Sequence, residues 1–153
     1  MDDDFPASGV PAAGDHRTIT NASGLHDPVA FGYSHAVAAA GELVFVAGQY
    51  SSDGTGAVVA DDFAGQVDRS LRRLGTALES VGLGFEHVVR LGSLVVDHDM
   101  AKLRVLGSAL HRVWGQRLPA QTLSGVAALA LPGMLFEIDA IAVRPIRPVA
   151  PTA

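Results

Sequence analysis

The sequence predicts an α+β fold in which two helices pack on one face of a single sheet. Three observations support this prediction: two segments carry apolar residues at helical spacing, extended segments flank both of them, and the last extended segment alternates apolar with mixed residues. The chain has 153 residues, 48% of them hydrophobic and 18% charged, which suits one domain with one core. We expect the folding unit to span residues 26–146.

The two ends of the chain differ from this unit in composition. Residues 1–25 are rich in Asp, Gly, Pro and Ala without apolar periodicity, and we interpret them as a flexible N-terminal arm. Residues 147–153 are interpreted as a Pro-rich C-terminal tail. The stretch from Pro145 to Ala153 has three prolines in nine positions, and a central strand does not tolerate them.

Two helices are expected inside the folding unit. The first begins after Asp61 or Asp62, either of which can cap it, and ends at Gly82. Its apolar stripe consists of Phe63, Val67, Leu71, Leu74, Leu78 and Val81. The second begins near Asp99 and ends at Gly115, with a stripe of Met100, Leu103, Leu106, Leu110 and Val113. Each helix is apolar on one side only, so each needs a sheet to cover that side.

The remaining periodic segments are expected to be strands. They are Ala36–Ala39, Leu43–Gly48, His87–Val96, Gln121–Ala127 and Leu135–Arg144. The turn at residues 40–42 predicts a hairpin between the first two of them.

The last strand has two different faces. Its apolar set suits the helices and comprises Phe136, Ile138, Ala140 and Ala142. The opposite set is mixed and comprises Leu135, Glu137, Asp139 and Ile141. A solvated face explains the two acids but exposes large apolar side chains, whereas a face shared with another subunit explains both. We favour the shared face, and the solvated one remains an alternative.

Composition and charge argue against several classes of function. The net charge of −5 and the pI near 5.6 provide no basic field for a phosphate backbone, so nucleic acid is not an expected partner. The chain has no cysteine, and its histidines lack metal-ligand spacing. Asp97-His98-Asp99 is the nearest candidate for a metal site and is interpreted as a helix cap. No metal and no cofactor are therefore expected.

The sequence also argues against export and membrane insertion. The N-terminus lacks a cationic start followed by an apolar run, so it does not resemble a secretory signal. The longest apolar run, residues 126–131, is far shorter than the roughly 20 residues that cross a bilayer. We expect a cytoplasmic protein without a membrane partner.

Four stretches together resemble the Rid superfamily, the reactive-intermediate deaminases also called YjgF proteins. They are Phe31–Val37, Val44–Gln49, Leu118–Gln121 and Phe136–Ala142, in that order and at the expected spacing. The resemblance implies a chorismate-mutase-like fold and a homotrimer whose sheets form an inner β-barrel. It also implies clefts between neighbouring subunits that bind a small molecule. Typical members hydrolyse reactive enamines and imines released by pyridoxal-phosphate enzymes.

The resemblance also assigns roles to residues. Glu137 stands at the acid that orients or activates water, and Tyr33 stands at the pocket tyrosine, so both are candidate catalytic residues. The candidate substrate-binding residues are Gln121, Gly48, Ala47, Gly107, Leu106 and Leu123. A solvated strand acid at Glu137 and a packed aromatic at Tyr33 remain alternatives.

One departure from the family pattern changes the expected substrate. Typical deaminases read Pro-Ala-Arg and bind the substrate carboxylate with that arginine, whereas this chain reads Pro119-Ala120-Gln121. An amide offers neither charge nor a rigid fork of donors. Losing a buried charged partner costs about 2–5 kcal/mol. Leu123 and Gly107 replace a cysteine and an asparagine of the family pocket, which should make the pocket less polar and roomier.

We therefore expect hydrolysis or tautomerisation of an enamine, an imine or a related reactive intermediate. The substrate should be small and uncharged, and typical 2-iminoacid deaminase activity is not expected. A non-catalytic ligand-binding or chaperone-like trimer is the alternative. Ribonuclease activity ranks last, because the chain lacks a basic stripe interleaved with aromatic residues.

Overall fold

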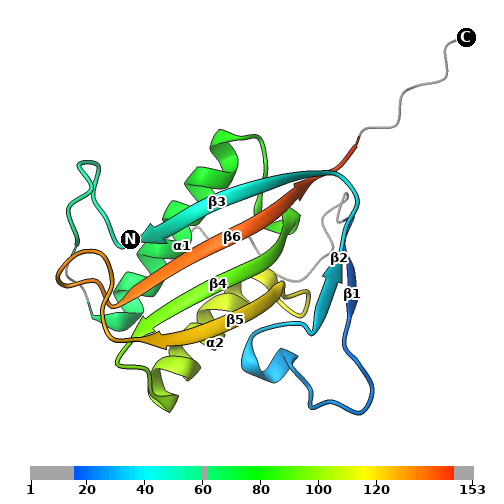
Figure 1. Ribbon diagram of the computed structural model, residues 1–153, viewed down its shortest axis with the longest axis horizontal. Coiled ribbons are helices and arrows are strands. Elements are labelled where there is room, and N and C mark those ends of the chain that lie inside the picture. Colours follow the sequence, from blue (N-terminus) through cyan, green and yellow to red (C-terminus); the bar gives the residue numbers. More distant parts are fainter. Residues whose placement is uncertain (1–15, 60–61, 147–153) are drawn as a thin grey trace, which may run out of the picture.

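The computed structural model describes residues 16–59 and 62–146, in which two helices cover one face of a mixed sheet (Figure 1). The sheet order is β3 (Glu42–Tyr50), β6 (Phe136–Arg144), β4 (Val88–Val96) and β5 (Ala120–Val126). The helices are α1 (Phe63–Ser80) and α2 (Met100–Trp114). Shorter elements are β1 (Thr18–Thr20), β2 (Ala36–Ala38) and the 3₁₀ helices η1 (Val29–Phe31) and η2 (Phe85–His87). The predicted α+β class is confirmed.

Both helices begin at an aspartate that accepts a backbone hydrogen bond. Asp62 Oδ1 accepts from the Gly65 N–H at 2.8 Å, and Asp99 Oδ1 accepts from the Lys102 N–H at 2.7 Å. The second bond, more than any other interaction, lowers the pKa of Asp99 below its ordinary value. The interpretation of residues 97–99 as a helix cap is therefore confirmed.

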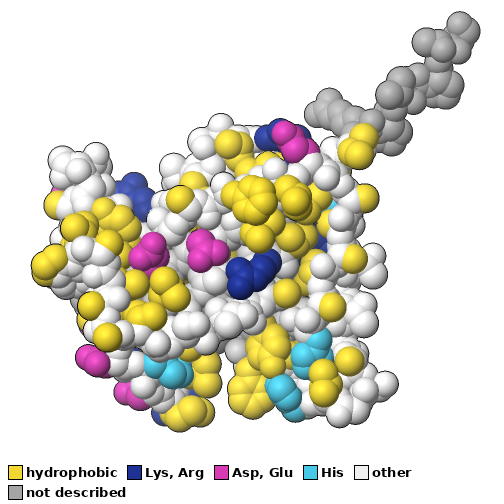
Figure 2. Space-filling view, in the orientation of Figure 1, with side chains coloured by type: hydrophobic (Ala, Val, Ile, Leu, Met, Phe, Trp, Pro, Cys, Tyr) yellow, Lys and Arg dark blue, Asp and Glu magenta, His cyan; other side chains and the backbone are white. Residues whose placement is uncertain are grey.

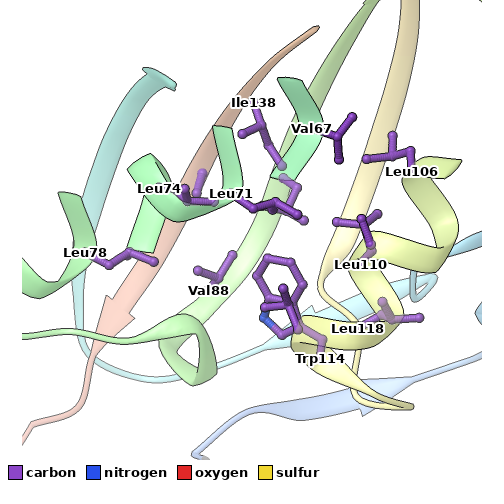
Figure 3. Close-up of a cluster of buried hydrophobic side chains, with 14 of the residues drawn as sticks. Val67, Leu71, Leu74, Leu78, Val88, Leu106, Leu110, Trp114, Leu118 and Ile138 are labelled. Carbon is purple, nitrogen blue, oxygen red and sulfur yellow. The ribbon is translucent and has the colours of Figure 1, made fainter. Parts of the chain in front are cut away.

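The core lies between the helices and one face of the sheet (Figure 3). The α1 stripe is fully buried at Val67, Leu71, Leu74 and Leu78. The helix-facing set of β6 is 0–2% exposed and consists of Phe136, Ile138, Ala140 and Ala142. The predicted α2 stripe is wrong at Met100, which is 60% exposed. The first turn of α2 faces η1 at the surface instead of the sheet.

The predicted hairpin is also wrong, because β2 does not pair with β3. The three residues of β2 pair antiparallel with β1, and β3 pairs antiparallel with β6. β3 joins the main sheet because Val44 and Val46 on its helix side pack against the core.

The strand β1 lies within the predicted flexible arm, so the described part of that arm is structured. Arg17, which precedes β1, is buried, and its Nη1 donates to the Val88 carbonyl at 2.9 Å. Arg117 Nη2 donates to the Arg17 carbonyl at 3.0 Å. A three-residue strand is too short to show periodicity, which is why the sequence did not predict it. Residues 1–15 and the predicted tail at 147–153 lie outside the described residues.

Candidate functional site

A β-bulge in β3 holds two of the candidate substrate-binding residues. Val46 pairs with Ala140 and Gln49 pairs with Ile138, so Ala47 and Gly48 together oppose Asp139. Such a bulge interrupts the ladder and redirects the backbone groups of its residues. Regular strand pairing therefore does not use all of the backbone N–H and C=O groups of Ala47 and Gly48.

Glu137 lies directly against this bulge. A Cβ placed on Gly48 would overlap Glu137 Oε1, so only glycine leaves room for the carboxylate in this position. Glu137 opposes Leu94 on β4 and projects from the face of the sheet that the helices leave uncovered. We call this face the open face. The structure thus brings together Glu137, Gly48 and Ala47.

A second carboxylate of β6, that of Asp139, lies in the same way against a glycine of a neighbouring strand. A Cβ on Gly92 of β4 would overlap Asp139 Oδ2. Arg90 Nη1 lies 4.0 Å from Asp139 Oδ1, and both side chains are about half exposed, so their attraction is weak. Figure 2 shows two acidic side chains and one basic side chain at the centre of the open face, with hydrophobic side chains around them.

The open face also exposes large apolar side chains. Phe45 is 72% exposed and Leu43 is 58% exposed, and Ile141, which pairs with Phe45, is partly exposed. The mixed character expected for this face of β6 is present. The described residues of a single chain do not cover it.

Gln121 projects from the opposite face of the sheet. It pairs with Leu91 of β4, and Leu123 pairs with Ser93. Leu91 and Ser93 are fully buried, so Gln121 and Leu123 lie on the side that the helices cover. Gln121 is half-buried, and its Oε1 accepts from the Ser93 hydroxyl at 2.9 Å. Leu123 packs against the core. The structure does not bring Gln121 and Glu137 together within one chain.

Tyr33 lies beside the segment that leads to Gln121. The Ser34 N–H donates to the Pro119 carbonyl at 2.9 Å, which joins the residue after Tyr33 to the start of β5. The Tyr33 hydroxyl is 2.7 Å from His26 Nε2. Two of the segments that carry the family resemblance are therefore adjacent on the Gln121 side of the molecule.

Gly107 lines a cavity of about 320 Å³ between η1 and α2. Its lining consists of Ala30, Phe31, Met100, Leu103, Arg104, Gly107, Ser108 and His111. A Cβ on Gly107 would meet no atom within 4 Å, whereas a Cβ on Gly32 would lie 3.3 Å from Gly107 Cα. Glycine at position 32 therefore allows the end of η1 to approach α2 closely, while the missing side chain at Gly107 leaves open space beside the helix. Apart from Gly107, no residue of this lining was predicted from the sequence to line a cavity.

One candidate substrate-binding residue is misplaced. Leu106 is 1% exposed and belongs to the hydrophobic core, so its side chain is not available to a ligand. The reason is helical geometry: successive residues are about 100° apart around the axis, so Leu106 faces the sheet while Gly107 faces the cavity.

Metal binding and membrane insertion find no support in the described residues. Across residues 16–59 and 62–146, no three His, Cys, Asp or Glu side chains are grouped as metal ligands. In the same part of the chain, neither long helix is apolar enough to span a bilayer.

Comparison with known proteins gives concordant results. Residues 25–144 match the family described as Endoribonuclease L-PSP. The chain is 37% identical over 120 residues to Protein DfrA of Myxococcus xanthus, covering 76% of this chain and 88% of that protein. It is similar to the Rid-family protein YyfB of Yersinia pestis, with 33% identity, a TM-score of 0.80, and coverage of 84% of this chain and 99% of that one. A YjgF-family protein of Mycobacterium tuberculosis has 36% identity, a TM-score of 0.58 and the same coverage.

Proposed function

Because this chain belongs to the endoribonuclease L-PSP family, the Rid or YjgF proteins, we propose that it transforms a small uncharged enamine or imine in a cleft between two copies of itself. The observation that carries the proposal is the division of the candidate residues between the two faces of the sheet. Glu137 with its bulge lies on the open face, and Gln121 lies on the helix-covered face of β5. One ligand reaches both groups only where the open face of one copy meets the β5 region of another.

Two features of the single chain support such an assembly. The open face exposes Phe45 and Leu43, and large apolar patches on a protein surface mark interaction sites. Within the described residues, β5 lies at the edge of the main sheet and pairs with β4, and the isolated bridge of Ser34 to Ala120 covers only its first residue. Edge strands are usually covered or blunted. A contact between two different surfaces of identical chains closes as a ring when the rotation permits. We therefore propose the homotrimer with an inner barrel that the family resemblance implies.

The chemistry assigned to this cleft is addition of water to a C=N bond. Glu137 takes a proton from water as the water oxygen bonds to the imine carbon, and the nitrogen gains a proton. The resulting carbinolamine then loses ammonia and leaves a carbonyl compound. Backbone groups of Ala47 and Gly48 hold the substrate next to Glu137. Tyr33 adds a hydroxyl on the side of Gln121. An enamine enters the same route after protonation of its carbon.

Two rival functions remain weaker. A non-catalytic ligand-binding or chaperone-like trimer is favoured only by the exposed apolar side chains, which a barrel interface explains equally well. Ribonuclease activity is suggested by the family's description. The chain carries a net charge of −5, and two carboxylates occupy the centre of its open face, where a phosphate backbone would be repelled.

Ammonia release from two imines tests the proposal. 2-Iminopropionate carries a carboxylate, and 2-iminopropionamide is its uncharged amide; both can be generated in situ. We expect the wild type to hydrolyse the amide and to leave the carboxylate near background. Glu137→Gln should reduce turnover by roughly 10²- to 10⁴-fold without changing the subunit number. Glu42→Gln, a matched change at an exposed position of β3, should leave both turnover and subunit number unchanged.

A second variant tests the missing charge at residue 121. Gln121→Arg should gain partial hydrolysis of 2-iminopropionate, because a guanidinium can pair with the carboxylate. Robust hydrolysis of 2-iminopropionate by the wild type would contradict the uncharged substrate. Unchanged turnover in Glu137→Gln would contradict the assigned role of that acid.

A further inference from the structure

Ser93 is a buried polar residue that no step above uses. It lies in the middle of β4 on the helix-covered face, and its side chain is fully buried. Its hydroxyl donates to Gln121 Oε1 at 2.9 Å across the parallel pair of β4 and β5. In the described part of the chain this is the hydrogen bond that satisfies the Ser93 side chain. A buried hydroxyl without a partner is costly.

This bond fixes the orientation of the Gln121 amide. An amide has one end that accepts hydrogen bonds and one end that only donates them. If the amide were turned over, Nε2 would donate to Ser93 Oγ, and the buried hydroxyl proton would lose Gln121 Oε1, the acceptor that it has in the described structure. Ser93 therefore holds Oε1 inward, and Nε2 remains as the donor that Gln121 offers outward.

We infer that Ser93 sets the substrate specificity of Gln121 by making it an uncharged, donor-only contact. The ligand that fits this contact presents a neutral acceptor, the carbonyl oxygen of an amide, lactam or ketone. A carboxylate fits poorly, because one neutral donor does not compensate for its lost hydration. An amine or ammonium fits poorly too, because the bond to Ser93 holds the amide oxygen toward the buried side, away from the ligand. This inference rests on the proposed function, in which Gln121 contacts the ligand.

Equilibrium binding to the intact protein tests the inference without turnover. Three small probes are compared by saturation-transfer NMR titration: 2-pyrrolidinone as a neutral lactam, pyruvate as a carboxylate and pyrrolidinium as a cationic donor. We expect the wild type to bind the lactam most tightly. Ser93→Ala frees the amide to rotate, so lactam affinity should fall roughly three- to tenfold, the size of one hydrogen bond, and pyrrolidinium affinity should rise.

Further variants separate specificity from general stability. Ser93→Thr keeps a hydroxyl and should retain the order of preference. Gln121→Glu turns the outward donor into an acceptor and should make pyrrolidinium the preferred probe. Ser124→Ala, at an exposed serine on the other face of β5, should change nothing. An unchanged preference in Ser93→Ala, or a wild type that does not prefer the lactam, overturns the inference.

The outcome is distinguishable from failure of the proposed function. Gln121→Leu should abolish the preference for the lactam. If it leaves all three affinities unchanged, Gln121 lies outside the binding site, and both the inference and the assigned cleft fail. Loss of turnover in Glu137→Gln with unchanged probe affinities leaves the inference intact. A wild type that hydrolyses neither imine but prefers the lactam through Ser93 supports the inference and contradicts the catalytic proposal.

Discussion

The two faces of the sheet differ in the side chains that they carry and in how deeply these are buried. On the helix-covered face, β6 contributes an unbroken apolar set from Phe136 to Ala142, and α1 covers it with fully buried side chains. On the open face, β6 contributes Glu137 and Asp139, and each carboxylate occupies space left by a glycine of a neighbouring strand. Phe45 remains largely exposed beside them.

This difference separates the residues that fold the chain from those that serve another purpose. A glycine inside a strand costs roughly 0.5–1 kcal/mol relative to alanine, so folding alone does not favour Gly48 or Gly92. Glycine at these two positions is explained if the carboxylates of Glu137 and Asp139 must lie flat against the sheet. The covered face thus explains the fold, with Gln121 and Ser93 at its β5 edge as the exception that the proposed cleft uses, and the open face carries the candidate acid Glu137.

The largest expected effect is on the covered face. Leu71→Ala removes a fully buried side chain and leaves a cavity, which should lower the free energy of unfolding by about 2–5 kcal/mol. The urea midpoint should fall without a change in subunit number. Phe45→Ala on the open face should instead weaken the contact between subunits. The variant should dissociate on dilution, which light scattering would detect. If both variants changed only the urea midpoint, the distinction between the two faces would be lost.

A smaller effect on stability is expected at Gly48, where a side chain of the open face lies closest to the backbone. In Gly48→Ala the new Cβ displaces the Glu137 carboxylate, which is the end of a flexible side chain and can rotate away. Stability should change by less than about 1 kcal/mol, while turnover should fall about 10²-fold because the acid is misplaced. Gly54→Ala is the control, since a Cβ there meets no atom within 4 Å. Equal turnover in both variants would show that the position of Glu137 does not matter.

The smallest effect concerns the start of α2 on the covered side. The pKa of Asp99 is lowered chiefly by its bond from the Lys102 N–H, from an ordinary value of 3.8. A lowered pKa in the folded state gives stability that is present above pH 3.8 and lost as the pH falls through the folded value. Asp99→Asn keeps a capping side chain but does not titrate. The stability difference between wild type and variant should therefore shrink below about pH 4. A difference that stays constant during acid unfolding would contradict this role.

The sequence predicted the parts of the molecule that repeat a local pattern. The spacing from Val67 to Leu78 predicted α1, Asp61 or Asp62 predicted its start, and Asp99 predicted the start of α2. Alternation along β6 correctly divided its residues between two faces, which placed Glu137 on the face away from the helices. These features depend on neighbouring residues of one segment, so a single sequence contains them.

The features that the sequence did not predict depend on a partner strand. The bulge at Ala47 and Gly48 is a matter of register with β6, and the pairing of β1 with β2 joins segments without periodicity. The face occupied by Gln121 was not predicted either, because β5 carries polar side chains on both sides, Gln121 on one and Thr122 and Ser124 on the other. The role of Ser93 depends on the same strand pair. Leu106 was misassigned because its neighbour Gly107, on the other side of the helix, lines the cavity.

The measurement that tests the divided site most directly is the mass of the intact protein in dilute solution, by light scattering after size exclusion. One chain has a mass of 15.8 kDa. If Glu137 of one copy and Gln121 of another form a single cleft, the particle should have three times the chain mass. Phe45→Glu, which places a charge in the middle of the open face, should reduce that mass. A wild type that elutes as a single chain would contradict the account, because the two groups would then remain on opposite faces of one sheet.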